Sequence, residues 1–287
     1  MSGGMSDELP PLPPLSGDAH KGDAGRVVLI GGSLGMAGSI ALSGRAALRS
    51  GAGLVTIAVP HAVQTTVAGF CPAVMTTGWN PETVTADDWL MVADGADAVA
   101  IGPGLGRDDR VQAAVREFVT RASQPVVVDA DALFALRSAD GALASAPRVL
   151  TPHAGEFARL HGVPIDEVAS HRVELAEAAA AALAAVVVLK GPGSVVTDGG
   201  RTAINRTGNA GLATGGSGDV LTGIIAALLG QQVPAWDAAR LAGHVHGLAG
   251  DIGAARLGQR SLTAVDLPDL LAEAWQQLEA SRHARSE

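Results

Sequence analysis

The sequence has little cysteine, little positive charge and no long apolar run, and each shortage excludes a class of protein. Its one cysteine, Cys71, cannot form an internal disulfide and is typical of the reducing cytoplasm. The 29 Asp and Glu residues outnumber the 20 Lys and Arg residues, and the net charge of −9 argues against a nucleic acid partner. The longest apolar run, at residues 178–189, is too short to cross a membrane, and the N-terminus lacks the basic start and apolar segment of a signal peptide. We therefore expect a cytoplasmic protein that binds neither nucleic acid nor membrane.

Short β-branched runs alternate with helical stretches after an N-terminal segment rich in Pro, Gly and Ser. Strands are expected at residues 27–30, 54–59, 98–101, 126–129, 149–151, 186–190 and 195–197, with 202–205 beside the last of them. Runs of four or five apolar β-formers between helices indicate strands buried on both faces, and hence a mainly parallel sheet. The sequence therefore predicts an α/β fold, with a flexible arm at residues 1–20 and one domain at residues 21–282. Residues 71–84 are expected to be irregular and residues 165–185 to form one alanine-rich helix.

Glycine-rich or polar motifs follow the predicted strands. They are GGSLGMAG at residues 31–38, GPGLG at 102–106, DAD at 129–131, TPHAGE at 151–156 and KGPGS at 190–194. Ligands of open α/β sheets bind outside the carboxyl ends of the strands, so these motifs are expected to converge on one ligand site. The spacings of the Rossmann and P-loop motifs are absent. GGSLG fits the nucleophile pattern of serine hydrolases, but too few strands precede it for that fold.

The stretch TGNAGLATGGSGDVLTG, at residues 207–223, predicts a glycine-rich loop that opens a buried helix. The helix start holds Gly215, Gly216, Ser217 and Gly218, whose unpaired N–H groups would form an anion hole. A carboxylate beside a phosphate site is well explained as a base for the group that attacks the phosphate, and this favours Asp219 as the catalytic residue. The alternative is an ordinary first-turn acid that stabilises its helix.

Two sets of residues are candidate metal ligands. Asp129 and Asp131 lack a third ligand nearby in the sequence, and Asp131 also fits a helix N-cap. His244 and His246 stand two apart on a predicted helix and therefore point to different faces, which is more typical of packing or surface residues than of metal ligands.

Three further residues lie at strand ends. Lys190 ends a buried strand, where an ammonium group is more often a phosphate or nucleotide contact than a random surface charge. His153 and Glu156 stand three apart at a helix start, and they could face one site as acceptor, donor or metal-water ligand. Alternatively, Glu156 simply favours the helix start.

Taken in order, these motifs resemble the ADP-dependent NAD(P)H-hydrate dehydratases of the ribokinase-like superfamily, from about residue 21 to residue 271. The resemblance implies a three-layer α/β/α fold with a mainly parallel sheet. It also implies a hydro-lyase that converts the S-form of hydrated NADH or NADPH back to NADH or NADPH through a phosphorylated hydroxyl. ADP would be the phosphoryl donor, Mg²⁺ would neutralise the phosphates, and AMP and phosphate would be released.

The resemblance also assigns site residues. The ADP or AMP contacts are Lys190, Gly191, Pro192, Gly193, Ser194 (where the family usually has Thr) and Gly218. The contacts to the hydrated dinucleotide are Ser39, Gly104 or Gly106, His153 and Asp219, with Asp131 and Asn209 as neighbours. Glu156 falls where ribokinase-like proteins place an acid near magnesium, which it would reach through water.

The resemblance further implies a homotetramer and a functional partner. The family's frequent N-terminal epimerase domain cannot fit into the first twenty or so residues, so we expect the epimerase not to be encoded in this chain.

Two other functions remain as alternatives. A ribokinase-like, ATP-dependent kinase of a small alcohol or vitamin precursor would share the GSGD loop and the base. The TPHAGE segment and the two extra glycine loops favour the dehydratase, because a dinucleotide needs a longer groove. A non-catalytic adenine-nucleotide sensor would have no use for the base at Asp219.

Overall fold

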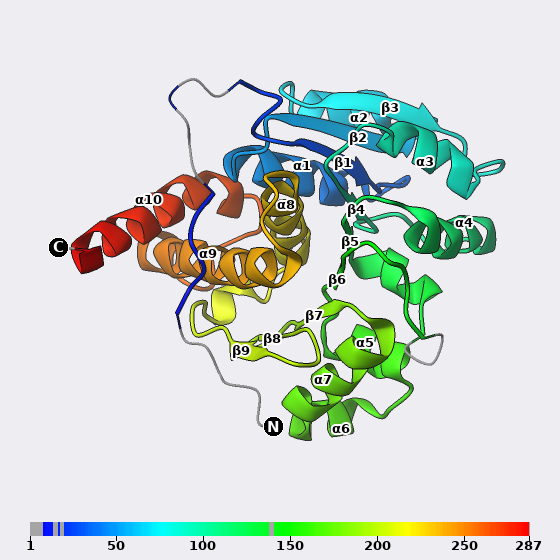
Figure 1. The fold of residues 1–287 in the computed structure, drawn as a ribbon. Coiled ribbons are helices and arrows are strands. Elements are labelled where there is room, and N and C mark those ends of the chain that lie inside the picture. The colour runs from blue at the N-terminus through cyan, green and yellow to red at the C-terminus, as the bar shows by residue number, and fades with distance from the viewer. Residues whose placement is uncertain (1–7, 14–16, 18–19, 138–140, 287) are drawn as a thin grey trace.

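The computed structural model describes residues 8–13, 17, 20–137 and 141–286. One nine-stranded sheet, in the order β3-β2-β1-β4-β5-β6-β7-β8-β9, runs through the molecule (Figure 1). The strands are β1 Arg26–Ile30, β2 Leu54–Pro60, β3 Met75–Trp79, β4 Ala98–Ile101, β5 Val126–Val128, β6 Arg148–Leu150, β7 Val186–Leu189, β8 Val195–Thr197 and β9 Thr202–Ile204. Strands β1 to β7 are parallel, and β8 and β9 extend the sheet as antiparallel strands.

Helices cover both faces of the sheet. They are α1 Ala37–Arg49, α2 His61–Phe70, α3 Ala86–Ala93, α4 Asp109–Arg121, α5 Ala154–His161, α6 Ile165–Ser170, α7 Arg172–Leu183, α8 Ser217–Gly230, α9 Ala235–Leu257 and α10 Leu267–Ser286, with short 3₁₀ helices η1 Ala130–Ala135 and η3 Ala210–Leu212. In β1, Val27 and Leu29 face the core under α1, α8 and α9, whereas Val28 and Ile30 face the core under α3 and α4. The three-layer α/β/α fold with a mainly parallel sheet is thus confirmed.

Two local predictions were wrong. Residues 75–79 form β3 inside the segment that was expected to be irregular. This strand lies at the edge of the sheet, where only Trp79 is buried, so its sequence has no apolar run to reveal it. The single helix expected at residues 165–185 is broken at His171, whose φ of −130° and ψ of 45° are not helical. Ser170 precedes the break, and its hydroxyl bonds to backbone carbonyls one turn earlier, which competes with a regular helix.

The arm expected at residues 1–20 falls partly outside the described residues. In its described part, the carbonyl oxygens of Glu8 and Pro10 accept hydrogen bonds from Arg240 of α9 and Arg282 of α10. Within the described ranges, no helix combines the length and apolarity needed to span a bilayer.

Helix α8 lies in close contact with α1 and is buried over nearly its whole length. A Cβ placed on Gly223 would lie 2.1 Å from the carbonyl oxygen of Ser43, so only glycine permits this approach. The hydroxyl of Ser43 donates a hydrogen bond of 2.8 Å to the carbonyl oxygen of Asp219. The contact therefore fixes the start of α8 relative to α1.

We predict that Gly223→Ala destabilises the protein, because the added methyl group must push apart two backbones. Overpacking of this kind typically costs about 1–3 kcal/mol of unfolding free energy. Chemical denaturation measures the loss. Gly69→Ala in α2 is a matched control, because a Cβ there meets no atom within 4 Å. That variant should gain roughly 0.5–1 kcal/mol, and equal stabilities of the two variants would contradict the close contact.

Candidate active site

Two glycine loops meet at the carboxyl ends of β1 and β4. The N–H of Gly32 donates to the carbonyl oxygen of Pro103 at 2.8 Å. Gly104 has a positive φ of 63°, and a Cβ on it would lie 2.6 Å from the carbonyl oxygen of Met36 and 3.1 Å from the Cβ of Ser39. The structure therefore brings Gly104 and Ser39, two predicted substrate contacts, next to each other.

The first turn of α8 has the geometry that an anion hole requires. Its N-cap is Gly216, in the left-handed region with φ of 93°, and it offers no side chain to the first N–H groups of the helix. No atom lies within 4 Å of a Cβ placed on Gly215, so the approach to this turn is open. Unpaired N–H groups at a helix start attract an anion.

Asp219 lies in this first turn and is only 9% exposed. Burial and, after it, the charge of Asp129 raise the pKa of its carboxyl group to about 7, against the opposing effects of a hydrogen bond with Ser39 and the charge of Lys190. A carboxyl group with a pKa near neutrality is suited to accept and release a proton.

A buried ion pair lies beside Asp219. The carboxylate of Asp129, 1% exposed, accepts hydrogen bonds from Lys190 Nζ at 2.8 Å, Thr151 Oγ1 at 2.7 Å and Thr222 Oγ1 at 2.8 Å. Three donors to one carboxylate satisfy it and argue against Asp129 as a metal ligand. The sequence showed two aspartates after β5 but did not reveal this role.

Lys190 faces the start of α8. A Cβ on Gly218 would lie 3.0 Å from Lys190 Nζ, and Glu156 Oε2 lies 3.8 Å from the same nitrogen. Burial lowers the pKa of Lys190, but the carboxylates of Asp129 and Glu156 raise it by more, so the net shift is upward. The ammonium group of Lys190 therefore stays charged beside the start of α8.

His153 and Glu156 form a reciprocal cap at the start of α5. Nδ1 of His153 accepts from the N–H groups of Gly155 at 3.0 Å and Glu156 at 3.2 Å, and Glu156 Oε2 accepts from the N–H of His153 at 2.8 Å. Nδ1 thus carries no proton, and Nε2, which lies 3.4 Å from Glu156 Oε1, is the nitrogen that carries it. Glu156 is the only acid at this cap, and the described part of the chain contains no group of three or more His, Cys, Asp or Glu residues placed to hold a metal.

Arg172 holds the start of the KGPGS loop at residues 190–194. Arg172 donates to the carbonyl oxygen of Leu189 at 3.0 Å, whereas Gly191, Pro192 and Gly193 are exposed. The hydroxyl of Ser194 donates to the carbonyl oxygen of Gly191 at 3.0 Å, so it bonds within the loop.

Asn209 and Asp131, the two predicted neighbours of the substrate, hold loops in place. Asn209 Nδ2 donates to Asp251 Oδ1 at 2.9 Å, which ties the glycine-rich loop to α9. A Cβ on Gly247 of α9 would lie 2.2 Å from Thr207 Oγ1, so the loop lies directly on this helix. Asp131 Oδ2 accepts from the N–H of Gly106 at 2.9 Å. Their contact with a substrate stays a prediction.

The sequence favours a packing or surface role for His246, and the structure packs it against the start of α8, a contact that the sequence did not reveal. Its Nε2 lies 2.9 Å from the carbonyl oxygen and 3.1 Å from the hydroxyl oxygen of Ser217. A carbonyl only accepts, so Nε2 carries the proton and the Ser217 hydroxyl keeps its own hydrogen for another acceptor. Burial lowers the pKa of His246 to about 4, against the opposing effect of the bond to Ser217, so the ring is neutral. His246 therefore fixes the first residue of α8.

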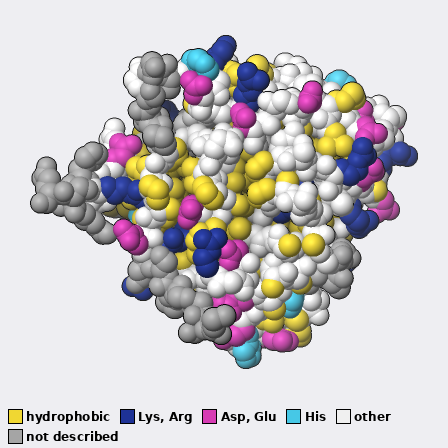
Figure 2. Space-filling model, in the orientation of Figure 1, with side chains coloured by type: hydrophobic (Ala, Val, Ile, Leu, Met, Phe, Trp, Pro, Cys, Tyr) yellow, Lys and Arg dark blue, Asp and Glu magenta, His cyan; other side chains and the backbone are white. Residues whose placement is uncertain are grey.

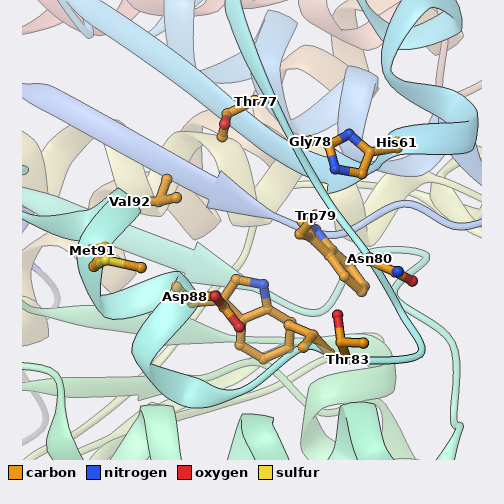
Figure 3. A pocket seen from close by; sticks show the side chains of 11 residues that line it. His61, Thr77, Gly78, Trp79, Asn80, Thr83, Asp88, Met91 and Val92 are labelled. Carbon is orange, nitrogen blue, oxygen red and sulfur yellow. The ribbon is translucent and has the colours of Figure 1, made fainter.

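A separate cavity of about 390 Å³ lies at the edge of the sheet, lined by side chains from the start of α2, the end of β3 and α3 (Figure 3). None of the predicted site residues lines it. Among the described residues, the indole nitrogens of Trp79 and Trp89 have no hydrogen-bond partner, but they are themselves buried and offer the cavity no donor. On the face drawn in Figure 2, basic side chains are interspersed with acidic ones and form no continuous basic surface.

The sheet and the glycine-opened helix at its carboxyl edge define a ribokinase-like protein. A ribokinase-like superfamily protein from Enterococcus faecalis V583 superimposes with a TM-score of 0.76 at 30% identity, over 91% of each chain. Ribokinase from Arabidopsis thaliana, at 15% identity and a TM-score of 0.51 over 86% of this chain and 98% of its own, shares the fold alone.

The family can be stated more narrowly. The model of the NAD(P)H-hydrate dehydratase family matches residues 27–273, and the chain belongs to this family. The ADP/ATP-dependent NAD(P)H-hydrate dehydratase from Bacillus subtilis, co-crystallised with ATP/Mg²⁺, superimposes with a TM-score of 0.82 at 35% identity, over 93% of this chain and 94% of its own.

Curated relatives agree with this family. The bifunctional NAD(P)H-hydrate repair enzymes Nnr of Moorella thermoacetica and Escherichia coli K12 are 45% and 42% identical, over 91% and 92% of this chain. The chain spans about half the length of these relatives, 51% and 49% respectively.

We predict that Asp219→Asn abolishes turnover and changes how stability depends on pH. The pKa of Asp219 is raised in the native state. Between about pH 4 and pH 7 the native protein therefore keeps the proton of this carboxyl group, whereas the unfolded chain has already released it. The contribution of Asp219 to the free energy of unfolding is thus fully present below pH 4. It is lost as pH rises through 7, by an amount on the order of 4 kcal/mol. The variant has no proton to release at this position, so it shows no such loss.

The melting temperature of Asp219→Asn minus that of the native protein should therefore grow from pH 4.5 to pH 7.5. Over the same interval the turnover of the native protein should rise as Asp219 ionises. A constant difference in melting temperature would show that Asp219 has an ordinary acidity.

We predict that His246→Asn lowers kcat by roughly 10- to 100-fold, because the start of α8 loses its bond from α9. KM for the nucleotide should change much less. His246→Gln should recover part of the rate, since its longer amide can reach the carbonyl oxygen of Ser217. His244→Asn, two residues away on another face of α9, is the control and should keep the native rate. Equal rates for the Gln and Asn variants at position 246 would contradict the specific role of Nε2.

Proposed function

We propose that the protein is a hydro-lyase that restores NADH or NADPH from the S-form of their hydrates, with ADP as phosphoryl donor and AMP and phosphate as products. The observation that carries the proposal is the Asp219 carboxyl group, with its pKa near 7, in the open first turn of α8. Membership of the NAD(P)H-hydrate dehydratase family supports the same reaction.

The first step is a phosphoryl transfer. The hydroxyl oxygen of the hydrated nicotinamide ring attacks the terminal phosphorus of ADP while Asp219 accepts the hydroxyl proton, and the bond to the AMP oxygen breaks. The N–H groups at the start of α8 and the ammonium group of Lys190 surround the place where negative charge develops. Hydroxide is a poor leaving group, and this step converts it into phosphate.

The second step is an elimination. Phosphate leaves with the electron pair of the carbon–oxygen bond, and the neighbouring ring carbon loses a proton, which restores the double bond. Overall, one hydrate and one ADP give one reduced dinucleotide, AMP, phosphate and a proton.

ADP is proposed to lie along the segment from Lys190 to Ser194 and against Gly218. Residues Gly191 to Gly193 are exposed and leave room for ADP, and Arg172 holds the start of the loop through the carbonyl oxygen of Leu189. Mg²⁺ would neutralise the phosphates. Glu156, beside Lys190, fits a contact through water, because its carboxylate retains acceptor capacity beyond its cap bond. The co-crystallisation of the B. subtilis dehydratase with ATP/Mg²⁺ is consistent with this arrangement.

Three further proposals remain. A homotetramer and an epimerase as functional partner, which converts the other form of the hydrate, come from the family resemblance, whereas a cytoplasmic location comes from the single cysteine. The epimerase is the proposal that the relatives bear on. The description of the Nnr relatives as bifunctional repair enzymes supports this proposal.

The test mixes the protein with hydrated NADH, ADP and magnesium and follows the absorbance of NADH. We expect the absorbance to recover in step with AMP formation, and ATP to be the poorer donor. The competing function, an ATP-dependent kinase of a small alcohol, predicts phosphate transfer to such an alcohol and no recovery of absorbance with either nucleotide. That result would overturn the dehydratase.

A further inference from the structure

Two arginines lie over the same aromatic ring at the rim of the site. The guanidinium carbon of Arg107 lies 5.1 Å from the ring centroid of Phe134, and that of Arg159 lies 4.4 Å from it. Phe134 belongs to η1 and is 39% exposed, so the ring holds both cations at the surface. We call Arg107 and Arg159 the arginine pair.

The arginine pair carries excess positive charge. Burial lowers the pKa of Arg159, and the nearby charges of Arg137 and Arg107 lower it further, with Glu156 as the opposing charge. Arg159 is fixed because it donates to the carbonyl oxygens of Phe134, at 3.0 Å, and Leu133. Cations held close together in this way favour an anion between or beside them.

The arginine pair is connected to the predicted substrate loops. Arg107 Nε donates to Asp131 Oδ1 at 2.8 Å, and the other oxygen of Asp131 accepts from Gly106. Asp131 is close enough to Asp219 for its charge to raise the pKa of that residue. The arginine pair therefore lies on the same rim as the proposed base, beyond the GPGLG loop.

The arginine pair and Lys190 differ in the groups that surround their positive charges. Lys190 is opposed by two carboxylates, Asp129 and Glu156. In Arg107, Asp131 engages Nε, and within the described ranges the two terminal nitrogens have no hydrogen-bond partner. A planar guanidinium with free terminal N–H groups matches a phosphate in a bidentate geometry.

We infer that Arg107 and Arg159 bind a phosphate group of the dinucleotide substrate, away from its nicotinamide ring. The inference rests on the proposed function. Two groups of the dinucleotide share this chemistry: the diphosphate that joins its halves, and the additional phosphate that distinguishes NADPH from NADH. In a chain with a net charge of −9, two arginines held close together at one rim attract an anionic substrate, even though Asp131 and Glu156 oppose part of their charge.

The test measures binding of hydrated NADPH and hydrated NADH by calorimetry without ADP, so that no turnover occurs. Arg107→Gln should weaken the binding of hydrated NADPH by 10-fold or more. A loss confined to hydrated NADPH identifies its additional phosphate, and an equal loss for both hydrates identifies the diphosphate. Arg107→Lys should lie between the native protein and the Gln variant, because it keeps the charge without the fork.

Arg110→Gln, on the exposed first turn of α4, is the matched control and should bind both hydrates as the native protein does. Arg159→Gln should weaken binding in the same pattern as Arg107→Gln, with its melting temperature recorded because Arg159 also holds η1. Native affinity of both variants for both hydrates would overturn the inference. Tight binding by the native protein without turnover once ADP and magnesium are added would instead overturn the proposed function and leave the phosphate contact standing.

Discussion

One buried carboxylate joins four separate elements of this protein. Asp129 follows β5 and accepts hydrogen bonds from Thr151 after β6, Lys190 after β7 and Thr222 within α8, which are 22, 61 and 93 residues away along the chain. Such a pair adds little net stability, but removing one partner leaves an uncompensated charge and costs about 3–5 kcal/mol. The network therefore serves to place the loops of the site relative to α8.

The same network affects the carboxyl group of Asp219. Asp129 accepts three hydrogen bonds, whereas the buried carboxyl group of Asp219 has, within the described part of the chain, the hydroxyl of Ser39 as its partner and the charge of Asp129 nearby. The carboxylate of Asp129 holds Lys190, and the carboxyl group of Asp219 is left to exchange a proton near neutrality. The acidity of Asp219 thus depends on residues from β5 and β7 as well as on its own helix.

Much of this could be predicted from the sequence. The buried parallel strands carry local apolar runs, and the glycine-rich start of α8 carries its own pattern, so fold and family were both accessible. Strand β3 was not, because an edge strand needs no apolar run. The contact of His246 with the start of α8 could not be predicted either, because its partner Ser217 lies 29 residues away and only tertiary packing brings the two together. For the same reason DAD indicated carboxylates at a strand end without showing which of them is buried.

Helix α9 holds two parts of the site at once. Through His246 it contacts the start of α8, and through Asp251 and Gly247 it contacts the glycine-rich loop at residues 207–209. Because one helix carries both attachments, the start of α8 and this loop are positioned relative to each other through α9. A mutation that displaces α9 is therefore expected to change the alignment of both parts, and with it catalysis, without touching a ligand.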